Sequence, residues 1–311
     1  MRWQKHGLIF APKRAAGWMN SHAQVPTPLV CDDCIRVYFS SRPQSNLSLT
    51  TFVDLDIENP SRILRLNPNP IIGLGNPGAF DEHGIMPSSA VRHDNKVYLY
   101  YSGWSRGATV PYTNSTGLAI SDDDGKTFVK VSDGPILSKS IHDPFSATSP
   151  VVIKEEEGSW HMWYCSGTQW LKIQGKYEHT YDIKYARSKD GIVWKPSAAP
   201  VIAQRTEAEA ITRPYVVKGH DGYNMWFCYR GSHNFRDGDE AYRIGYAHSN
   251  DLKEWNRKDE TVGIDISEAG WDSKMIAYPA VITLKRCTLM FYNGNGFGVD
   301  GFGYATLLED R

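Results

Sequence analysis

The segment HMWYCSG at residues 161–167 decides the fold, because close variants of it recur along the chain. Its hydrophobic and aromatic residues alternate with smaller or more polar ones, which is typical of a β-strand. The other copies are VYLYYSGW (97–104), NMWFCYRG (224–231), LMFYNG (289–294) and the weaker RVYFSSR (36–42). Repetition of this kind indicates an architecture in which each copy belongs to one structural unit.

Each copy is expected to be the second strand of its unit. A hydrophobic strand precedes it, and a third repeated strand follows it, as in IKYARS (183–188) and IGYAHS (244–249). The serines that end successive third strands, Ser121, Ser188 and Ser249, are 67 and 61 residues apart. Four short strands in such a length are typical of a propeller blade, and the Asp-Gly and Asn-Asp turns indicate antiparallel neighbours.

The repeats therefore predict an all-β fold, a five-bladed β-propeller with four antiparallel strands in each blade. The blades are expected near residues 24–75, 80–138, 143–203, 207–263 and 272–311. The last unit ends after its third strand, so a strand near residues 3–10 is expected to supply the fourth strand and close the ring. No linker interrupts the units, and residues 1–311 are predicted to form one domain.

The composition excludes several classes of function. With 34 basic and 35 acidic residues, the chain lacks the charge that nucleic-acid binding requires. It contains neither an apolar run long enough to span a membrane nor the apolar core of a secretory signal near its start. The cysteine pair Cys31 and Cys34 lacks the second pair that a zinc site needs. These features predict a cytoplasmic protein without a cofactor, and they leave its oligomeric state open.

Repeated features are expected to be structural. Most of the aromatic residues, which make up 12% of the chain, belong to the repeated strands and are expected to fill the core. Three units also follow their third strand with an acidic turn and an aromatic residue. These are Asp124, Asp190 and Asp251, with Phe128, Trp194 and Trp255. An acid that recurs in this way is expected to lock the turn instead of forming an active site.

The direction of the chain brings two sets of loops to one end of the propeller axis, called the mouth. They are the loops that enter first strands and those that leave second strands. Entry loops of four units carry a carboxylate at nearly the blade spacing: Asp81, Asp143, Glu207 and Asp272, with Glu209 close by. Converging anions would raise some of their pKa values, as acid/base catalysis requires. The alternative is that each carboxylate holds the backbone of its own loop.

Residues that are not repeated at the mouth are candidates for ligand binding. The candidates are Arg42, Trp104, Trp170, Arg213, Arg230, Tyr278 and Asn293. Tryptophan stacks on sugar rings, while arginine and asparagine bind hydroxyl or phosphate groups, so the set suits a carbohydrate or sugar-phosphate ligand. His22, His83 and His142 leave a central metal ion open as an alternative, although their unequal offsets from the strands disfavour it.

The repeats MWYCSG, IKYARSKDGIVW, MWFCYRGS and YRIGYAHSNDLKEW resemble those of the five-bladed β-propeller glycosidase superfamily. That superfamily includes arabinanases, β-xylosidases, invertases, levansucrases and mannoside phosphorylases. The segments RPYVV, GWDSK and YPAVI also resemble glycosidase-like propellers of bacterial polysaccharide loci. The resemblance covers nearly the whole chain and implies a carbohydrate-active enzyme that uses carboxylates at the mouth.

The catalytic motifs of those relatives are only partly present. Thr27, Ser89 and Thr148 stand where arabinanase-type enzymes carry acids. GWMNSH (17–22) is similar to the invertase motif WMNDPNG, but Ser21 replaces its nucleophilic aspartate. HDP (142–144) is similar to the Arg-Asp-Pro motif of invertases, which supports Asp143 as a functional acid.

We therefore expect a glycoside hydrolase-like enzyme that acts on a glycosyl bond at the mouth. Asp143 and Asp81 are expected as base or stabiliser, and Glu207 or Glu209 as acid, because both retaining and inverting mechanisms need two carboxylates. A glycosyltransferase or phosphorylase that uses a phosphorylated or nucleotide-linked sugar stays open. So do a non-catalytic glycan-binding propeller, which the missing acids favour, and a protein-interaction scaffold. The sugar, the linkage and the stereochemical outcome are not predicted.

Overall fold

A computed structural model describes residues 1–13 and 15–308, and its regular structure is almost entirely β-strand. The strands are β1 (Trp3–Phe10), β2 (Ser21–Val30), β3 (Cys34–Arg42), β4 (Leu49–Asp56), β5 (Ile63–Leu66), β6 (Gly84–His93), β7 (Lys96–Arg106), β8 (Tyr112–Ser121), β9 (Val129–Lys130), β10 (Ala147–Lys154), β11 (Trp160–Ile173), β12 (Lys176–Ser188), β13 (Lys195–Pro196), β14 (Ala210–Gly219), β15 (Gly222–Arg230), β16 (Arg243–Ser249), β17 (Asn256–Arg257), β18 (Ala277–Thr283), β19 (Thr288–Asn293) and β20 (Phe302–Leu307). Helical backbone in the described residues is limited to η1 (Asp259–Thr261) and α1 (Asn295–Gly298), both too short to cross a membrane.

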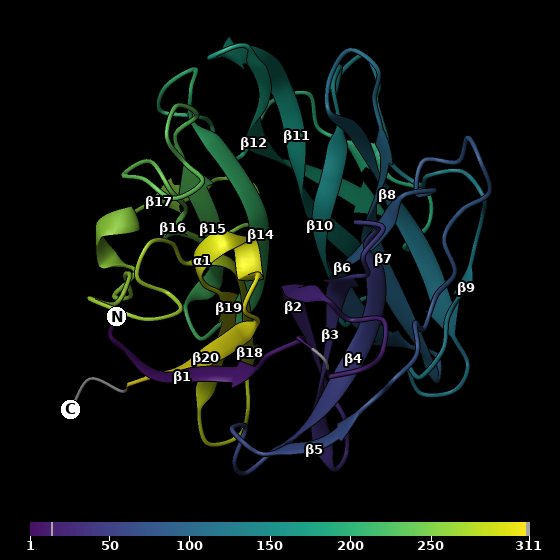
Figure 1. Cartoon of the computed structure of the whole chain (residues 1–311), viewed down its shortest axis with the longest axis vertical. Helices are drawn as coiled ribbons and strands as arrows, with labels where there is room; N and C mark the ends of the chain where they lie inside the picture. Colours follow the sequence, from purple (N-terminus) through teal and green to yellow (C-terminus); the bar gives the residue numbers. More distant parts are fainter. Residues whose placement is uncertain (14, 309–311) are drawn as a thin grey trace.

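The strands pair into five antiparallel, four-stranded blades, as the repeats predict (Figure 1). Blade 1 is β2–β3–β4–β5, blade 2 is β6–β7–β8–β9, blade 3 is β10–β11–β12–β13, blade 4 is β14–β15–β16–β17 and blade 5 is β18–β19–β20–β1. Blades 2 and 3 are also joined by one parallel bridge between Ser115 and Ala147. The predicted all-β propeller with five blades is confirmed.

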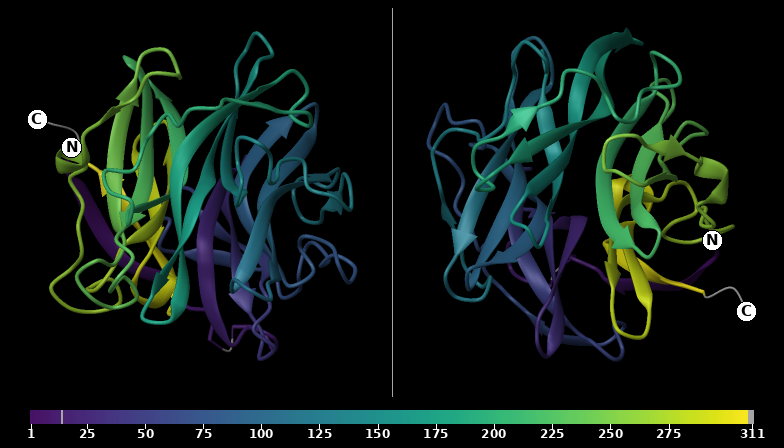
Figure 2. Two further views of the ribbon diagram at one scale, coloured as in Figure 1. Left: turned by 90° about the horizontal axis from the view of Figure 1, so that it is seen from above. Right: turned by 180° about the vertical axis from the view of Figure 1, so that it is seen from behind.

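Strand β1 closes the ring, as predicted. It pairs antiparallel with β20, so that Trp3 lies opposite Leu307 and Phe10 opposite Phe302. In both views of Figure 2 the purple N-terminal strand lies beside the yellow C-terminal segment. The Trp3 ring is buried, packs edge-on against Trp226 of blade 4 and thereby also ties β1 to the neighbouring blade. The two ends of the described chain therefore hold each other in place.

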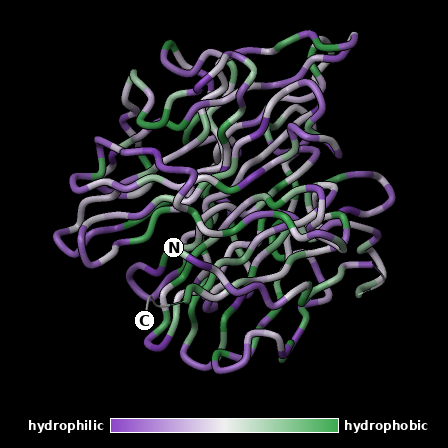
Figure 3. The backbone as a smooth tube through the Cα atoms, turned by 90° about the vertical axis from the view of Figure 1, so that its left-hand side faces the viewer, coloured by the Kyte–Doolittle hydropathy of each residue, from purple (hydrophilic) through white to green (hydrophobic). Residues whose placement is uncertain are grey.

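The hydrophobic core lies between the blades. Separate buried clusters join blades 1 and 2, blades 2 and 3, blades 3, 4 and 5, and blades 5 and 1. Repeated aromatic residues such as Tyr38, Tyr100 and Trp163 are fully buried in these clusters. Figure 3 shows hydrophobic stretches along the strands and hydrophilic colours over many connecting loops. Each large apolar side chain buried in this way contributes about 1.5–3 kcal/mol.

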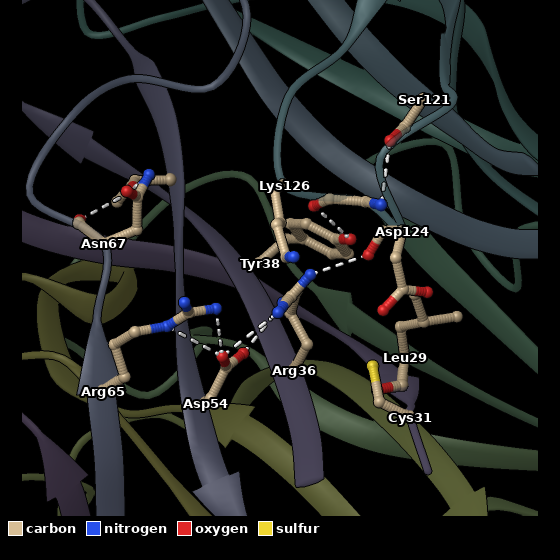
Figure 4. Close-up of polar contacts among 12 residues, drawn as sticks. Leu29, Cys31, Arg36, Tyr38, Asp54, Arg65, Asn67, Ser121, Asp124 and Lys126 are labelled. Carbon is tan, nitrogen blue, oxygen red and sulfur yellow. Dashed lines mark hydrogen bonds and ion pairs between the residues drawn. The ribbon is translucent and has the colours of Figure 1, made fainter. Parts of the chain in front are cut away.

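Polar contacts join neighbouring blades at the end opposite the mouth. The hydroxyl of Tyr38 in blade 1 donates a hydrogen bond to the carbonyl of Gly125 in blade 2, at 2.9 Å. Arg36 donates to the carbonyl of Asp124 at 2.7 Å and forms an ion pair with Asp54 at 2.8 Å (Figure 4). The acidic turn of one blade is therefore held by the second strand of the blade before it.

The repeated acidic turns are structural, with one correction to the residue assignment. Asp190 accepts hydrogen bonds from two backbone N–H groups at 2.9 Å, and Asp251 does so at 3.0 and 2.9 Å. In blade 2 the residue that makes these bonds is Asp123, not Asp124. Asp124 instead has a left-handed backbone with a φ of 64°, and its carboxylate pairs with Arg92.

The first strand of each blade carries a bulge near the mouth. The register of its pairing slips around a proline, which has no N–H to donate to the ladder. In four blades the residue before this proline has a left-handed φ between 50° and 57°: Val25, Ser149, Arg213 and Tyr278. In blade 2 the residue at the position with the left-handed backbone in the other blades is Pro87, and the register shift follows it. Bulges re-aim side chains, and here they recur around the axis where a ligand would bind.

Candidate functional site

The mouth is the end at which first strands begin and second strands end. The pairing shows this directly: Ala210 at the start of β14 lies opposite Arg230 at the end of β15. Ser21 at the start of β2 likewise lies opposite Arg42 at the end of β3. The prediction that entry loops and second-strand exits share one rim is confirmed.

Three of the predicted catalytic carboxylates are buried in equivalent places in their own blades. Asp81, Asp143 and Asp272 each accept a hydrogen bond from a tyrosine hydroxyl of the second strand, at 3.0, 3.1 and 3.0 Å. Each also pairs with a lysine, at 2.6, 3.5 and 2.8 Å. In the same order, the tyrosines are Tyr101, Tyr164 and Tyr292, and the lysines are Lys130, Lys184 and Lys5.

Blade 4 departs from this arrangement. Phe227 stands in the place of the tyrosine and cannot donate a hydrogen bond. Glu209 is the buried acid there, and Arg257 donates to both of its oxygens at 2.7 and 3.1 Å. Glu207 is exposed, and its backbone carbonyl accepts a hydrogen bond from Gln169. The two neighbouring glutamates therefore have different environments.

These contacts favour the interpretation in which the repeated carboxylates hold their entry loops. Each buried acid is bonded within its own blade, so its charge is balanced by a neighbouring lysine or arginine instead of by a ligand. The catalytic roles of Asp81, Asp143, Glu207, Glu209 and Asp272 stay predictions.

We expect Asp272→Asn to lower the free energy of unfolding by about 1–3 kcal/mol, because Lys5 and Tyr292 lose a charged partner. Lys5 belongs to β1, so the loss falls on the strand that closes the ring. Urea unfolding followed by tryptophan fluorescence measures the change, with the exposed Asp122→Asn as control. An unchanged unfolding midpoint would contradict the loop-holding role of this carboxylate.

Four predicted ligand residues gather around the axis at the mouth: Arg42, Arg213, Arg230 and Tyr278. The Tyr278 ring lies 5.7 Å from the ring of Tyr242, whose hydroxyl accepts a hydrogen bond from Arg230 at 3.3 Å. Arg42 and Arg213 lie within electrostatic range of Tyr278. Burial raises the pKa of Tyr278 well above its ordinary value, so its hydroxyl keeps its proton. These residues come from three blades, and the structure brings them together at the mouth; their role in binding a ligand stays a prediction.

The other three candidates differ in exposure. Asn293 is fully buried and bonds to the backbone of β2 at 2.8 Å, which joins blade 5 to blade 1. Trp104 is half-buried, and its indole N–H donates to the Ser48 hydroxyl at 3.1 Å. Trp170 is also half-buried and stacks on His179 with ring centroids 4.1 Å apart. Trp104 and Trp170 are therefore the two with surface left for a ligand.

The described residues give no support to a central metal ion. Within residues 1–13 and 15–308, no group of three His, Cys, Asp or Glu side chains is arranged to hold one. Burial and the charge of Arg42 lower the pKa of His22 to about 3, so this imidazole is neutral. His83 lies 3.5 Å from Glu82, and the carbonyl of His142 accepts a hydrogen bond from Lys184.

The structure adds a group of mouth residues that the repeats did not predict, called the polar cluster. These residues of blades 2 and 3 hold buried polar atoms without a hydrogen-bond partner in the described part of the chain. The atoms are Asn114 Oδ1, Ser146 Oγ, Thr148 Oγ1, both ring nitrogens of His179 and Asp182 Oδ1. Each such atom costs about 1–3 kcal/mol. Five residues with this cost in one region indicate a place that a polar ligand or water completes.

Asp182 is the titratable group of the polar cluster. Burial is the main reason that its pKa is raised to about 7; the charge of Asp143 adds to the effect and that of Lys184 opposes it. Asp182 can therefore give or take a proton near neutral pH. Burial and nearby cationic side chains lower the pKa of His179 to about 3, so its imidazole is neutral. The one signal in the sequence was the polar segment YEHTYD (177–182), which departs from the other third strands.

A cavity of about 310 Å³ opens at the rim of blades 2, 3 and 4. Its walls are the loop 107–111, the start of β12 at 176–178 and Arg236. Glu178 lines it and binds Arg236 through both oxygens, at 2.7 and 3.0 Å. Glu178, His179 and Asp182 all belong to β12. One strand thus carries both the cavity wall and the polar cluster.

Comparisons with known proteins agree with this fold. The Glycosyl hydrolases family 32 N-terminal domain matches residues 72–182. "Uncharacterized protein Rv1502" from Mycobacterium tuberculosis is 38% identical over 309 residues, which cover 99% of each chain. The crystal structure of a glycosyl hydrolase from Bacteroides ovatus superposes with a TM-score of 0.75 at 15% identity, covering 99% of this chain and 94% of its own. A thermostable family-43 glycoside hydrolase gives a TM-score of 0.66 at 14% identity, covering 97% and 94%.

The fold and these matches define the class of protein. The chain has the fold of the five-bladed propeller glycosidases, with solved relatives in the fold from a family-43 glycoside hydrolase and the GH130 family, and the family 32 model matches residues 72–182. The chain belongs to the same family as the mycobacterial protein Rv1502, with which it aligns over 99% of both sequences.

Proposed function

We propose that the protein is a carbohydrate-active enzyme that cleaves or transfers a glycosyl group at the mouth of the propeller. The observation that carries this proposal is Asp182, a buried carboxyl group with an unpartnered oxygen and a pKa of about 7. The match of residues 72–182 to the family 32 glycosyl hydrolase domain and the likeness of the fold to glycoside hydrolases support the reaction class. We also propose a cytoplasmic location, which the five free cysteines support.

The proposed mechanism gives Asp182 the role of proton donor. Breaking a glycosidic bond requires a proton for the leaving oxygen and a negative charge that stabilises the cationic transition state. A carboxyl group that titrates near neutrality is suited to the first task, because it is partly protonated at working pH yet gives up its proton readily. Asp143 keeps its expected role as base or stabiliser, for which its HDP motif marks it as a functional acid, and its charge acts directly on Asp182.

Two further groups of the mouth have assigned roles in binding. Trp170 is half-exposed and fixed by its stacking on His179, which makes it a rigid surface for a sugar ring. Asn114 and the neutral His179 have unpartnered atoms that are suited to sugar hydroxyl groups, which both donate and accept. None of these roles requires a metal ion.

A screen for product formation tests the proposed function. The full chain is incubated with nitrophenyl glycosides and with bacterial polysaccharides, each with and without inorganic phosphate or nucleotide sugars. We expect product from at least one substrate, and Asp182→Asn should abolish its formation. Release in buffer alone identifies a hydrolase, release that depends on phosphate identifies a phosphorylase, and transfer from a nucleotide sugar identifies a transferase.

One observation favours a second candidate, a glycan-binding propeller without catalysis. The buried repeated carboxylates are all engaged with lysine or arginine, which leaves Asp182 as the acid without such a direct partner in the polar cluster. Binding on a glycan array, combined with no product from any bound glycan, would establish this candidate and reject the enzyme.

A further inference from the structure

Arginines at the mouth differ from other buried arginines in how their charge is balanced. Arg36, at the opposite end, pairs with Asp54 at 2.8 Å, and Arg65 reaches the same carboxylate at 2.7 Å (Figure 4). Arg213 and Arg230 are just as deeply buried, with exposed fractions of 1% and 5%. Among the described residues, however, both have only neutral hydrogen-bond partners.

Arg213 crosses the axis from blade 4. Its guanidinium donates to the carbonyl and hydroxyl of Ser88 in blade 2, both at 2.6 Å. It also donates to the Pro26 carbonyl at 3.2 Å and the Thr27 hydroxyl at 2.8 Å in blade 1. Its Nε is buried without a partner in the described chain. A full positive charge therefore lies on the axis with four neutral acceptors and no carboxylate bound to it.

Arg230 and Arg42 add two more charges at the same mouth. Arg230 donates to the carbonyls of His179 and Gly231, at 2.8 and 2.7 Å, and to the Tyr242 hydroxyl. Arg42 is half-buried; its two terminal nitrogens donate to the amide oxygens of Gln24 and Asn46 at 3.0 and 3.4 Å, and its Nε has no partner in the described residues. Like Arg213 and Arg230, Arg42 therefore has only neutral hydrogen-bond partners in the described residues.

Tyr278 shows that the three charges act on one place. Its ring lies within electrostatic range of all three guanidinium groups. Burial lowers the pKa of Arg213 to about 10 and also lowers the pKa of Arg42, because no nearby anion compensates for the lost hydration. The neighbouring imidazole of His22 is neutral and offers no countercharge. Buried charge of this kind is costly unless an anion pairs with it.

We propose that the mouth binds its substrate through an anionic group, a carboxylate or a phosphate, that Arg42 binds near Tyr278 in the positive field of Arg213 and Arg230. This inference rests on the proposed function and names the class of its substrate: an acidic sugar, a sugar phosphate, or a sugar transferred to free phosphate. All three sources present oxygens that arginine binds in pairs. The acids of the entry loops do not cancel these charges, because each is bonded inside its own blade.

Calorimetric titration of the full chain at constant ionic strength tests the inference. The probes are glucuronate, galacturonate, glucose 1-phosphate, glucose 6-phosphate, inorganic phosphate, and neutral glucose and galactose. We expect at least one anion to bind ten times more tightly than its neutral counterpart. Arg42→Gln should weaken that binding by about ten- to a hundredfold, as expected for loss of a charge-assisted bond. Arg42→Lys should retain part of it, and the exposed Arg286→Gln should leave it unchanged.

The outcomes separate the two proposals. Equal affinity for neutral and anionic sugars, equal binding by the wild type and Arg42→Gln, or no anion binding at all would overturn the anion site. If a neutral glycoside is cleaved and none of the anions binds, the proposed enzymatic function is retained and the anion site is rejected. If anions bind but no product forms in any screen, the proposed anion site is supported and the proposed enzymatic function is rejected. Binding of inorganic phosphate alone identifies phosphate as the source, and binding of uronates alone identifies a sugar carboxylate.

Discussion

Replacement of Asp182 by asparagine is expected to lower turnover by about 100- to 10,000-fold while the protein stays folded. The amide has nearly the same size and can still hydrogen-bond, but it cannot give up a proton, and a positioned proton donor contributes a factor of this order. The measurement is kcat/KM of wild type and variant on the first active glycoside, between about pH 5 and pH 9. In the wild type, activity should fall as the pH rises through about 7, where Asp182 loses its proton.

The same substitution is expected to stabilise the protein at alkaline pH, which replacement of an ion-paired carboxylate such as Asp272 would not do. Because the pKa of Asp182 is raised in the folded state to about 7, from an ordinary value of 3.8, the folded protein binds a proton that the unfolded chain releases. Its contribution to stability is therefore fully present below about pH 4 and is lost as the pH rises through 7. Above that range the buried anion costs up to about 4 kcal/mol, which the neutral asparagine avoids.

Urea unfolding at about pH 5 and pH 8 measures this effect. The urea midpoint of Asp182→Asn, relative to that of the wild type, should be higher at about pH 8 than at about pH 5. The exposed Asp122→Asn should show no such change with pH. A difference between variant and wild type that does not change with pH would show that Asp182 is not a buried, protonated acid. Unchanged turnover would remove it from the catalytic mechanism.

The fold was predictable because its signals are local and repeated. Alternation within HMWYCSG (161–167) and its copies defines strands, the acidic turns join them, and a missing fourth strand in the last unit points to the N-terminus. The bulges were less predictable. A proline marks each one, but whether the preceding residue takes a left-handed backbone depends on the blades packed around it. Arg213 and Tyr278 owe their positions to these bulges.

The site was less predictable because it, too, depends on contacts between segments that are distant in the sequence. Chain direction correctly brings entry loops and second-strand exits to one rim, which is why Arg42, Arg230 and Tyr278 are found there. It says nothing about the partner of a side chain. The charge of Asp81 is balanced by Lys130, which lies on β9, the outermost strand of the same blade. The sequence around Asp81 gives no sign of this contact. Asp182 was not predicted as a site residue because it lies in a third strand, and the repeat pattern assigns third-strand residues to the core.

Replacement of Arg213 by methionine is expected to lower the free energy of unfolding by about 3 kcal/mol. Two effects oppose each other. Removing a buried charge that lacks an anionic partner relieves a desolvation cost of several kcal/mol. Removing its four hydrogen bonds costs more, because bonds from a charged donor contribute about 1.5–3 kcal/mol each and because buried carbonyls of Pro26 and Ser88 lose their donor. Methionine is the variant of choice because its unbranched apolar chain limits the cavity left behind.

The loss should be visible as a lower urea midpoint, with exposed Arg187→Met as the matched control. An unchanged or higher midpoint would mean that burying the Arg213 charge costs at least as much free energy as its hydrogen bonds contribute. Arg213 would then not stabilise the contact between the blades. The proposed anion site predicts a second effect of the same substitution. A saturating anionic ligand stabilises the wild type through its preference for the folded state. In Arg213→Met that stabilisation should shrink, since the charge on the axis is gone while Arg42 and Arg230 remain. The two measurements together separate what Arg213 contributes to joining the blades from what it contributes to the ligand.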